Sequence, residues 1–213
     1  LGLLNSALAS SIAAAALSIA EGRHLEQFPV DVFQTGSGTS TNMNANEVIA
    51  TLASRQSGQA VHPNDHVNCS QSSNDVIPTA IHVSAELALA NSLMPALHRL
   101  AEVIAAREAG LTDSIKTGRT HLMDAMPLSL AQELSGWRAQ LVQAGQRSAA
   151  CRSELRQLAQ GGTAVGTGVN ADPQFAARFC FYLNESCAAS FKPAENFFAA
   201  LASQDIAVAL SGQ

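Results

Sequence analysis

The sequence predicts an all-α protein that is built from long helices. Of its 213 residues, 47% are hydrophobic but only 5% are aromatic. An apolar fraction that is rich in Ala and poor in aromatic residues favours close-packed helices over a β-sandwich. Two stretches, residues 74–109 and 128–159, contain little that would stop a helix. The sequence offers no convincing series of strands, no internal repeat and no low-complexity linker against this interpretation.

Capping and turn residues define the elements that are expected before residue 74. Asn5 or Ser6 is a suitable N-cap for a first helix, and Gly22 is a suitable stop. The following segments alternate between turn-rich and helical patterns. A loop, a short helix and a second loop are expected at residues 23–41, 42–54 and 55–73.

Two long helices are expected next. The first begins with Asn74 or Asp75 as its N-cap, carries Pro78 in its first turn and is expected to kink at Pro95. A loop at residues 110–127 separates it from the second helix, which carries an apolar stripe through Trp137. A Gly-rich loop and two shorter helices complete the chain, at residues 161–168, 173–187 and 194–211.

The charge content sets limits on partners. Only 14% of the residues are charged, against about 25% in an average soluble domain, so we expect much of the helical surface to be buried against partner subunits. No stretch reaches about 18 uninterrupted apolar residues, and a transmembrane helix is not predicted. The net charge of −5 argues against nucleic acid or an anionic membrane as the main partner.

The four cysteines are expected to be reduced thiols of a cytosolic protein. Their positions show no Cys-x-x-Cys pair and no zinc-type spacing; they are Cys69, Cys151, Cys180 and Cys187. A disulfide framework is the alternative.

Three polar loops, each preceding a predicted helix, are candidates for a carboxylate or phosphate site. They lie at residues 34–39, 70–75 and 117–121. Hydroxyl, amide and free backbone N–H groups at helix N-termini together suit an anion, although plain N-capping calls for the same residue types. His121, beside hydroxyl residues, is the best acid–base candidate. The Gly-rich loop at 161–168 lacks the Lys and the preceding strand of a nucleotide-binding loop.

Six runs of residues are specific enough to indicate a family. They are QTGSGT at 34–39, NMNANE at 42–47, HPND at 62–65, SQSSND at 70–75, GRTHL at 118–122 and GGTAVGTG at 161–168. Together they resemble class II fumarase, the metal-free fumarate hydratase of the fumarase/aspartase superfamily. Aspartases typically carry Gln in place of His121 and a Ser-Thr-Asn-Asp run in place of residues 72–75. At both places this sequence has the residues that are typical of fumarases.

The resemblance implies the reversible hydration of fumarate to malate through a carbanion, without cofactor or metal. It implies that a group of hydroxyl and amide side chains binds the small dicarboxylate substrate: Ser37, Thr39, Ser72, Ser73, Asn74 and Thr120. His121 would hold and activate water. A second anion site would comprise His62, Asn64 and Asp65, although Gln59 lies near the place of an Arg that the family carries.

The resemblance also implies an all-α, long-helix bundle of the fumarase/aspartase type. Residues 1–76 would be part of the N-terminal, mostly helical domain and residues 77–213 part of the central helical-bundle domain. Four subunits would form a homotetramer in which each active site is shared between subunits.

One family motif has no counterpart in this sequence. The run Gly-Ser-Ser-x-Met-Pro-x-Lys-x-Asn, which supplies the proton-abstracting Ser and a substrate-binding Lys, does not occur in it. We therefore expect an incomplete subunit that is inactive by itself. The alternatives are an enzyme like aspartate ammonia-lyase and a non-catalytic helical scaffold. The expected location is the bacterial cytoplasm, with the mitochondrion as an open alternative.

Overall fold

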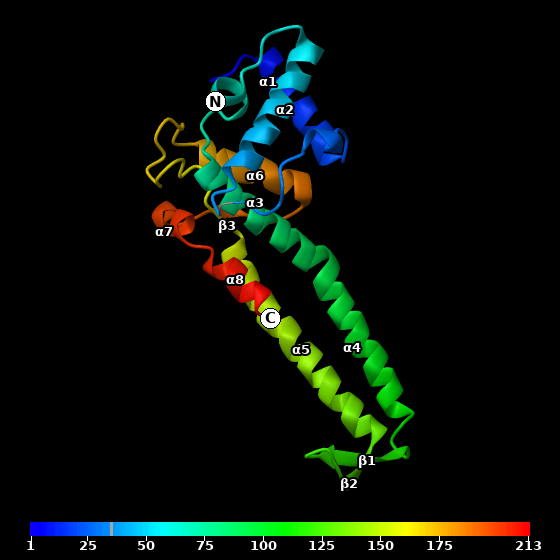
Figure 1. Cartoon of the computed structure of the whole chain (residues 1–213). Coiled ribbons are helices and arrows are strands. Elements are labelled where there is room, and N and C mark those ends of the chain that lie inside the picture. The colour runs from blue at the N-terminus through cyan, green and yellow to red at the C-terminus, as the bar shows by residue number, and fades with distance from the viewer. Residues whose placement is uncertain (35) are drawn as a thin grey trace. The chain divides into compact units, whose positions relative to one another are not determined.

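The computed structural model describes residues 1–34 and 36–213, and most of them are helical (Figure 1). The all-α prediction is thereby confirmed in outline. The chain divides into two compact units, which are described separately. Unit 1 comprises Leu1–His82 and Arg156–Gln204, and unit 2 comprises Val83–Leu155 and Asp205–Gln213. The predicted domain division after residue 76 refers to a complete subunit and stays a prediction.

In unit 1, helix α1 (Ser6–Ala20) packs against helix α2 (Thr39–Ser57). The predicted cap is confirmed, because the Asn5 side chain accepts a hydrogen bond from the Leu8 N–H at 2.8 Å. Small side chains allow the two helices to approach closely, and the buried apolar cluster between them consists of Leu8, Ala15, Ala50, Ala53 and Val61. The predicted second helix, residues 42–54, is three residues longer at each end.

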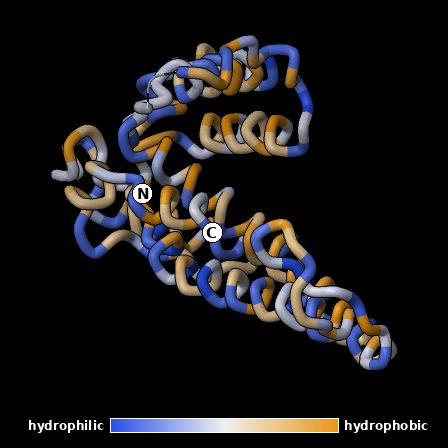
Figure 2. The backbone as a smooth tube through the Cα atoms, turned by 60° about the horizontal axis from the view of Figure 1, so that its bottom comes forward, coloured by the Kyte–Doolittle hydropathy of each residue, from blue (hydrophilic) through white to orange (hydrophobic). Residues whose placement is uncertain are grey.

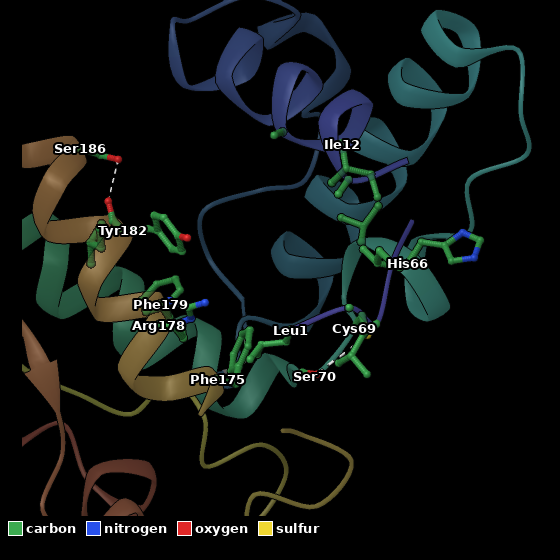
Figure 3. A pocket seen from close by; sticks show the side chains of 17 residues that line it. Leu1, Ile12, His66, Cys69, Ser70, Phe175, Arg178, Phe179, Tyr182 and Ser186 are labelled. Atoms are coloured by element: carbon green, nitrogen blue, oxygen red, sulfur yellow. Dashed lines mark hydrogen bonds between the residues drawn. The ribbon is translucent and has the colours of Figure 1, made fainter. Parts of the chain in front are cut away.

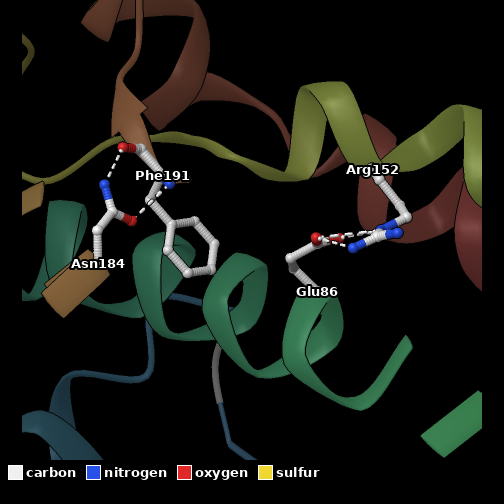
Figure 4. Close-up of polar contacts among 4 residues, drawn as sticks. All are labelled: Glu86, Arg152, Asn184 and Phe191. Carbon is white, nitrogen blue, oxygen red and sulfur yellow. Dashed lines mark hydrogen bonds and ion pairs between the residues drawn. The ribbon is translucent and has the colours of Figure 1, made fainter. Parts of the chain in front are cut away.

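The remaining elements of unit 1 are short, apart from α6. They are η1 (Leu25–Gln27), η2 (Pro63–Val67), the first part of α3 (Ser73–Ala88), β3 (Gln157–Leu158), α6 (Phe175–Cys187), β4 (Lys192–Pro193) and α7 (Phe197–Ala202). Strands β3 and β4 pair in parallel. The Asn184 side chain holds α6 against the residue that precedes β4. It donates to the Phe191 carbonyl at 2.8 Å and accepts from the Phe191 N–H at 2.7 Å (Figure 4).

Unit 2 is dominated by a pair of long helices that lie side by side, α4 (Met94–Ala109) and α5 (Leu130–Leu155) (Figure 1). Helix α8 (Asp205–Ser211) packs on α5, and the buried cluster consists of Leu89, Cys151, Leu155 and Ile206. A π-helical turn, η3 (Leu89–Leu93), joins α3 to α4 immediately before Pro95. It marks the position of the predicted irregularity, because Pro cannot donate the hydrogen bond of a regular α-helix.

A β-hairpin replaces the loop that was predicted at residues 110–127. Strand β1 (Ile115–Thr120) pairs antiparallel with β2 (Met123–Ser129). The prediction was wrong because Gly118 and Pro127 break the alternation that is typical of strands. Gly118 lies at an irregularity of the pairing, where a Cβ atom would meet the Met126 carbonyl oxygen at 2.6 Å.

Two further predictions differ from the structure. The single helix expected at 194–211 is divided into α7 and α8, because Ser203 has extended backbone angles, φ −145° and ψ 152°. The expected absence of a membrane-spanning segment is not supported by length and composition: Ser73–Ala109 contains an 18-residue window of mean hydropathy 1.2. The core helix of a soluble protein passes the same test, and apolar and polar residues are interspersed along the long helices (Figure 2).

A buried ion pair lies in unit 2. Glu86 on α3 has a side chain that is only 2% exposed, and it accepts hydrogen bonds from the Arg152 guanidinium on α5 at 2.8–3.1 Å (Figure 4). The carboxylate raises the pKa of the Arg152 guanidinium above its ordinary value, chiefly through these hydrogen bonds. The pair therefore links the end of α3 to α5.

Candidate active site

Three of the predicted substrate-binding residues line one pocket of unit 1. Its volume is about 500 Å³, and its polar wall includes Ser37, Ser73 and Asn74. Val165 and Phe198 contribute to an apolar wall. Segments that are far apart in the sequence therefore meet here: the loop before α2, the start of α3, the Gly-rich loop and α7.

The start of α3 positions Ser73 and Asn74. The predicted N-cap, Asn74 or Asp75, is wrong, because Ser72 has this role: its Oγ accepts from the Asn74 N–H at 3.3 Å. Asp75 completes a capping box by accepting from the Ser72 N–H at 2.9 Å. These bonds leave the Ser73 and Asn74 side chains on the outer side of the first turn, where they face the pocket.

Asn42, which is not among the predicted site residues, orients Ser73. Its Nδ2 donates to Ser73 Oγ at 2.8 Å. The Ser73 hydroxyl therefore accepts from α2 and keeps its own O–H to donate to a ligand. The signal was present in the NMNANE run, but the run alone does not show that Asn42 faces α3.

The loop before α2 places Ser37 at the pocket. Thr39 is the first residue of α2, and its hydroxyl donates to Ser37 Oγ at 3.3 Å. Gly38 between them has a left-handed backbone, with φ of 58°, and a Cβ atom there would lie 2.9 Å from the Ile77 side chain. Glycine is required at this position because the loop packs directly on α3.

The Gly-rich loop at 161–168 forms the other side of the pocket and is held by Asp75. The buried carboxylate of Asp75 accepts from the Gly161 N–H at 3.0 Å and the Thr163 N–H at 2.8 Å. Burial raises the pKa of the Asp75 carboxyl above its ordinary value, against the opposite effect of these N–H groups. The amides of Gly161 and Thr163 thus bind an internal carboxylate.

Thr120 and His121 belong to unit 2 and lie at the tip of its hairpin. Both are exposed, and His121 and Leu122 form the two-residue turn between β1 and β2. Both turn residues have left-handed backbones, with φ of 52° and 61°. Left-handed angles at two positions suit the turn of a tight hairpin, but Asn and Gly are the residues that usually adopt them. His121 therefore occupies a backbone conformation that is uncommon for residues other than glycine.

The predicted second anion site maps onto η2. His62, Asn64 and Asp65 are exposed and lie within one turn. The His62 Nδ1 atom caps this turn by accepting from the Asp65 N–H at 3.2 Å, and the Asp65 carboxylate lies 3.3 Å from the same nitrogen. The three side chains are thus neighbours, while the anion site itself stays a prediction.

A larger cavity of unit 1, of about 580 Å³, lies elsewhere and contains none of the predicted site residues (Figure 3). Its walls are mainly apolar and come from α1, α6 and the segment around Cys69. All four cysteines are free thiols, in agreement with the prediction. Within residues 1–34 and 36–213, no three His, Cys, Asp or Glu side chains are grouped so that they could hold a metal ion.

The chain is similar to known lyases over its whole length. The model of a family described as lyase matches residues 1–213. Fumarate hydratase class II 2 of Pseudomonas aeruginosa is 54% identical over 210 residues, which are 99% of this chain and 46% of that protein. Fumarate hydratase class II of Halobacterium salinarum is 49% identical over 210 residues, which are 96% of this chain and 45% of that protein.

Solved structures give the same result for the fold. The crystal structure of a class II fumarase from Schistosoma mansoni superposes with a TM-score of 0.92 at 41% identity, covering 99% of this chain and 48% of that one. The chain thus spans about half the length of the relatives that it matches.

Proposed function

Because the chain belongs to the lyase family and matches class II fumarases over nearly its whole length, we propose that the whole protein catalyses the reversible hydration of fumarate to malate. The observation that carries the proposal is the pocket that Ser37, Ser73 and Asn74 line together. Hydroxyl and amide groups donate to carboxylates without neutralising them, which suits a substrate whose negative charge moves during the reaction.

In the proposed mechanism, hydroxyl and amide side chains bind the substrate carboxylates, and His121 acts on the water. In malate dehydration, a base removes the C3 proton, and the electron pair left on C3 spreads into the adjacent carboxylate. This electron pair then forms the C2=C3 double bond as the C2–O bond breaks, and the hydroxyl takes a proton from the group that activates water in the reverse direction, so that water leaves. Ser37, Thr39, Ser72, Ser73, Asn74 and Thr120 would stabilise the carboxylates. His121 would hold this water and, in the reverse direction, activate it for attack.

The direct test follows fumarate through its ultraviolet absorbance in the protein expressed from its complete gene. We expect absorbance to appear when malate is added. No change with malate, together with ammonia release from aspartate, would replace the proposal by the ammonia-lyase alternative. No reaction with either substrate would favour the scaffold. We expect the 213-residue chain alone to be inactive, because the Ser/Lys run is not among its residues.

The role of His121 is tested by His121→Asn. We expect kcat to fall by about 10²–10⁴, as for loss of an acid–base group. The matched control is His24→Asn, because His24 also has a left-handed backbone, with φ of 62°, and Asn tolerates this conformation well. A wild-type kcat for His121→Asn would remove His121 from the mechanism.

A homotetramer with shared active sites is part of the proposal. Apolar side chains remain about half-exposed on both long helices of unit 2: Leu100 and Val103 on α4 and Trp137 on α5 are 47%, 52% and 53% exposed. Exposed apolar side chains on long helices are suited to helix–helix contacts, and we assign these side chains to contacts between copies of the chain. Sedimentation of the whole protein should give a tetramer, whereas a stable monomer would contradict this assignment.

We also propose a cytoplasmic location, which the four free cysteines support because thiols stay reduced in that compartment. Cell fractionation should recover the hydratase activity in the cytoplasmic fraction. Recovery with the membranes would contradict it.

A further inference from the structure

Asp75 is a buried carboxylate that the proposed mechanism does not use. It is 0% exposed and lies on the first turn of α3. Its Oδ1 accepts from the Ser72 N–H, and its Oδ2 accepts from the N–H groups of Gly161 and Thr163, at 2.8–3.0 Å. A buried charge requires such partners, since an unpaired one is costly. One side chain thus joins two segments that are more than 80 residues apart.

The two joined segments also meet inside the pocket. Asn74 precedes Asp75, and its Nδ2 donates to the Ala164 carbonyl at 2.7 Å. Ala164 follows Thr163, whose N–H Asp75 holds. The orientation of the Asn74 amide therefore depends on the place of the loop, and the place of the loop depends on Asp75.

The loop has little freedom to adopt another place while these bonds persist. A Cβ atom on Gly161 would lie 2.6 Å from the Ala176 Cβ, and one on Gly166 would lie 2.8 Å from the Phe198 ring. Thr163 has a left-handed backbone, with φ of 55°, which is disfavoured for a β-branched residue. Such a conformation persists only where the surroundings hold it, and the Asp75 carboxylate is one of the groups that does so.

We propose that Asp75 is a positioning residue, whose carboxylate holds the Gly-rich loop against the start of α3 and so orients Asn74 for the dicarboxylate. This rests on the proposed function in that Asn74 binds the substrate. A merely structural role would predict a loss of stability only. Positioning predicts that substrate affinity falls through Asn74 in particular.

Glu86 provides a matched control. It is the other deeply buried carboxylate of α3, with 2% exposure, but it lies in unit 2 and pairs with Arg152 there. We expect both Asp75→Asn and Glu86→Gln to lower the melting temperature of the whole protein. Only Asp75→Asn should raise KM for malate, by at least tenfold, with KM of Glu86→Gln within twofold of wild type.

A double-mutant cycle tests the route through Asn74. If Asp75 acts by orienting Asn74, Asp75→Asn should raise KM much less in an Asn74→Ala background than in the wild type. Equal effects in both backgrounds would overturn the proposal, as would an unchanged KM in Asp75→Asn or an equal rise in Glu86→Gln. If Asp75→Asn does not fold, Asp75→Ser replaces it, because it keeps an acceptor oxygen in a smaller volume.

Two readouts separate this inference from the proposed function. Binding of succinate, a dicarboxylate that cannot be hydrated, is measured by calorimetry, and hydrogen exchange of residues 160–165 is followed by mass spectrometry. A wild-type protein that binds succinate without hydrating fumarate would refute the function, while the Kd of the variants still tests Asp75. We expect Asp75→Asn to weaken succinate at least tenfold and to speed exchange in this segment. Unchanged exchange and affinity would overturn the inference.

Discussion

Removing Arg152 from its ion pair with Glu86 should destabilise the protein strongly. The Glu86 side chain is 2% exposed and the Arg152 side chain 29%, and their nearest atoms are 2.8 Å apart. At this distance Coulomb's law gives about 6 kcal/mol for an effective dielectric constant of about 20, and about 1.5 kcal/mol in water. Breaking a buried pair from one side costs about 3–5 kcal/mol, because the remaining buried charge loses one of the groups that compensate it. Because Arg152 is partly exposed to solvent, we expect the unfolding free energy to fall by an amount at the lower end of this range, about 3 kcal/mol.

The assay is urea unfolding of the whole protein at fixed concentration. Arg152→Met keeps much of the apolar stem and should lower the midpoint by about 1–2 M, for an m-value of about 1.5–3 kcal/mol/M. The double variant Glu86→Leu/Arg152→Leu should lie close to wild type, since apolar replacement of both partners is often neutral. Arg147→Met is the control on the same helix, because Arg147 is exposed and bonded to Gln213. A shift below about 0.3 M for Arg152→Met, or a double variant less stable than Arg152→Met, would refute the reasoning.

Three other predictions follow from single residues. Gly118→Ala should destabilise the hairpin by about 1–3 kcal/mol, because the added Cβ would meet the Met126 carbonyl oxygen at 2.6 Å; faster hydrogen exchange of the hairpin checks this, and unchanged exchange contradicts it. The pKa of Asp75 is raised, so this carboxyl keeps its proton to higher pH in the native state than in the unfolded state. The protonated Asp75 therefore contributes fully to stability below about pH 4, and this contribution is lost as the pH rises through the raised pKa. Unfolding free energy measured against pH should therefore fall less steeply above about pH 4 in Asp75→Asn than in wild type, and identical slopes would refute this. Burial raises the pKa of the Cys180 thiol to about 11, which leaves about 0.1% thiolate at about pH 8. Peptide mapping after iodoacetamide treatment should find Cys180 largely unmodified, and rapid alkylation in the native protein would contradict this.

Local signals in the sequence predicted the helices well. The Asn5 cap of α1 and the long helix that became α5 depend on residues within a few positions of one another, so they are visible without tertiary contacts. The hairpin was missed for the opposite reason. The register of the two strands shifts between Thr117 and Arg119. This shift depends on pairing between the strands, and the same residues taken alone are typical of a loop.

Part of the pocket lining was predictable from the sequence, but its arrangement was not. The family motifs placed Ser37, Ser73 and Asn74 together, and they line one pocket. Asp75 was interpreted as a possible helix cap. Its bonds to Gly161 and Thr163 span more than 80 residues, and no local pattern encodes them.

The turn at His121 and Leu122 has a consequence for attempts to engineer this protein. Each residue with a side chain in a left-handed conformation costs roughly 1–2 kcal/mol of stability. Leu122 is fully exposed, so packing within the chain does not offset the cost at this residue. A selection for thermal stability alone would therefore favour Gly or Asn at both positions. Glycine has no imidazole, so the replacement that relaxes the backbone at residue 121 also removes the proposed acid–base group. Stability and chemistry are in direct competition at the tip of this hairpin.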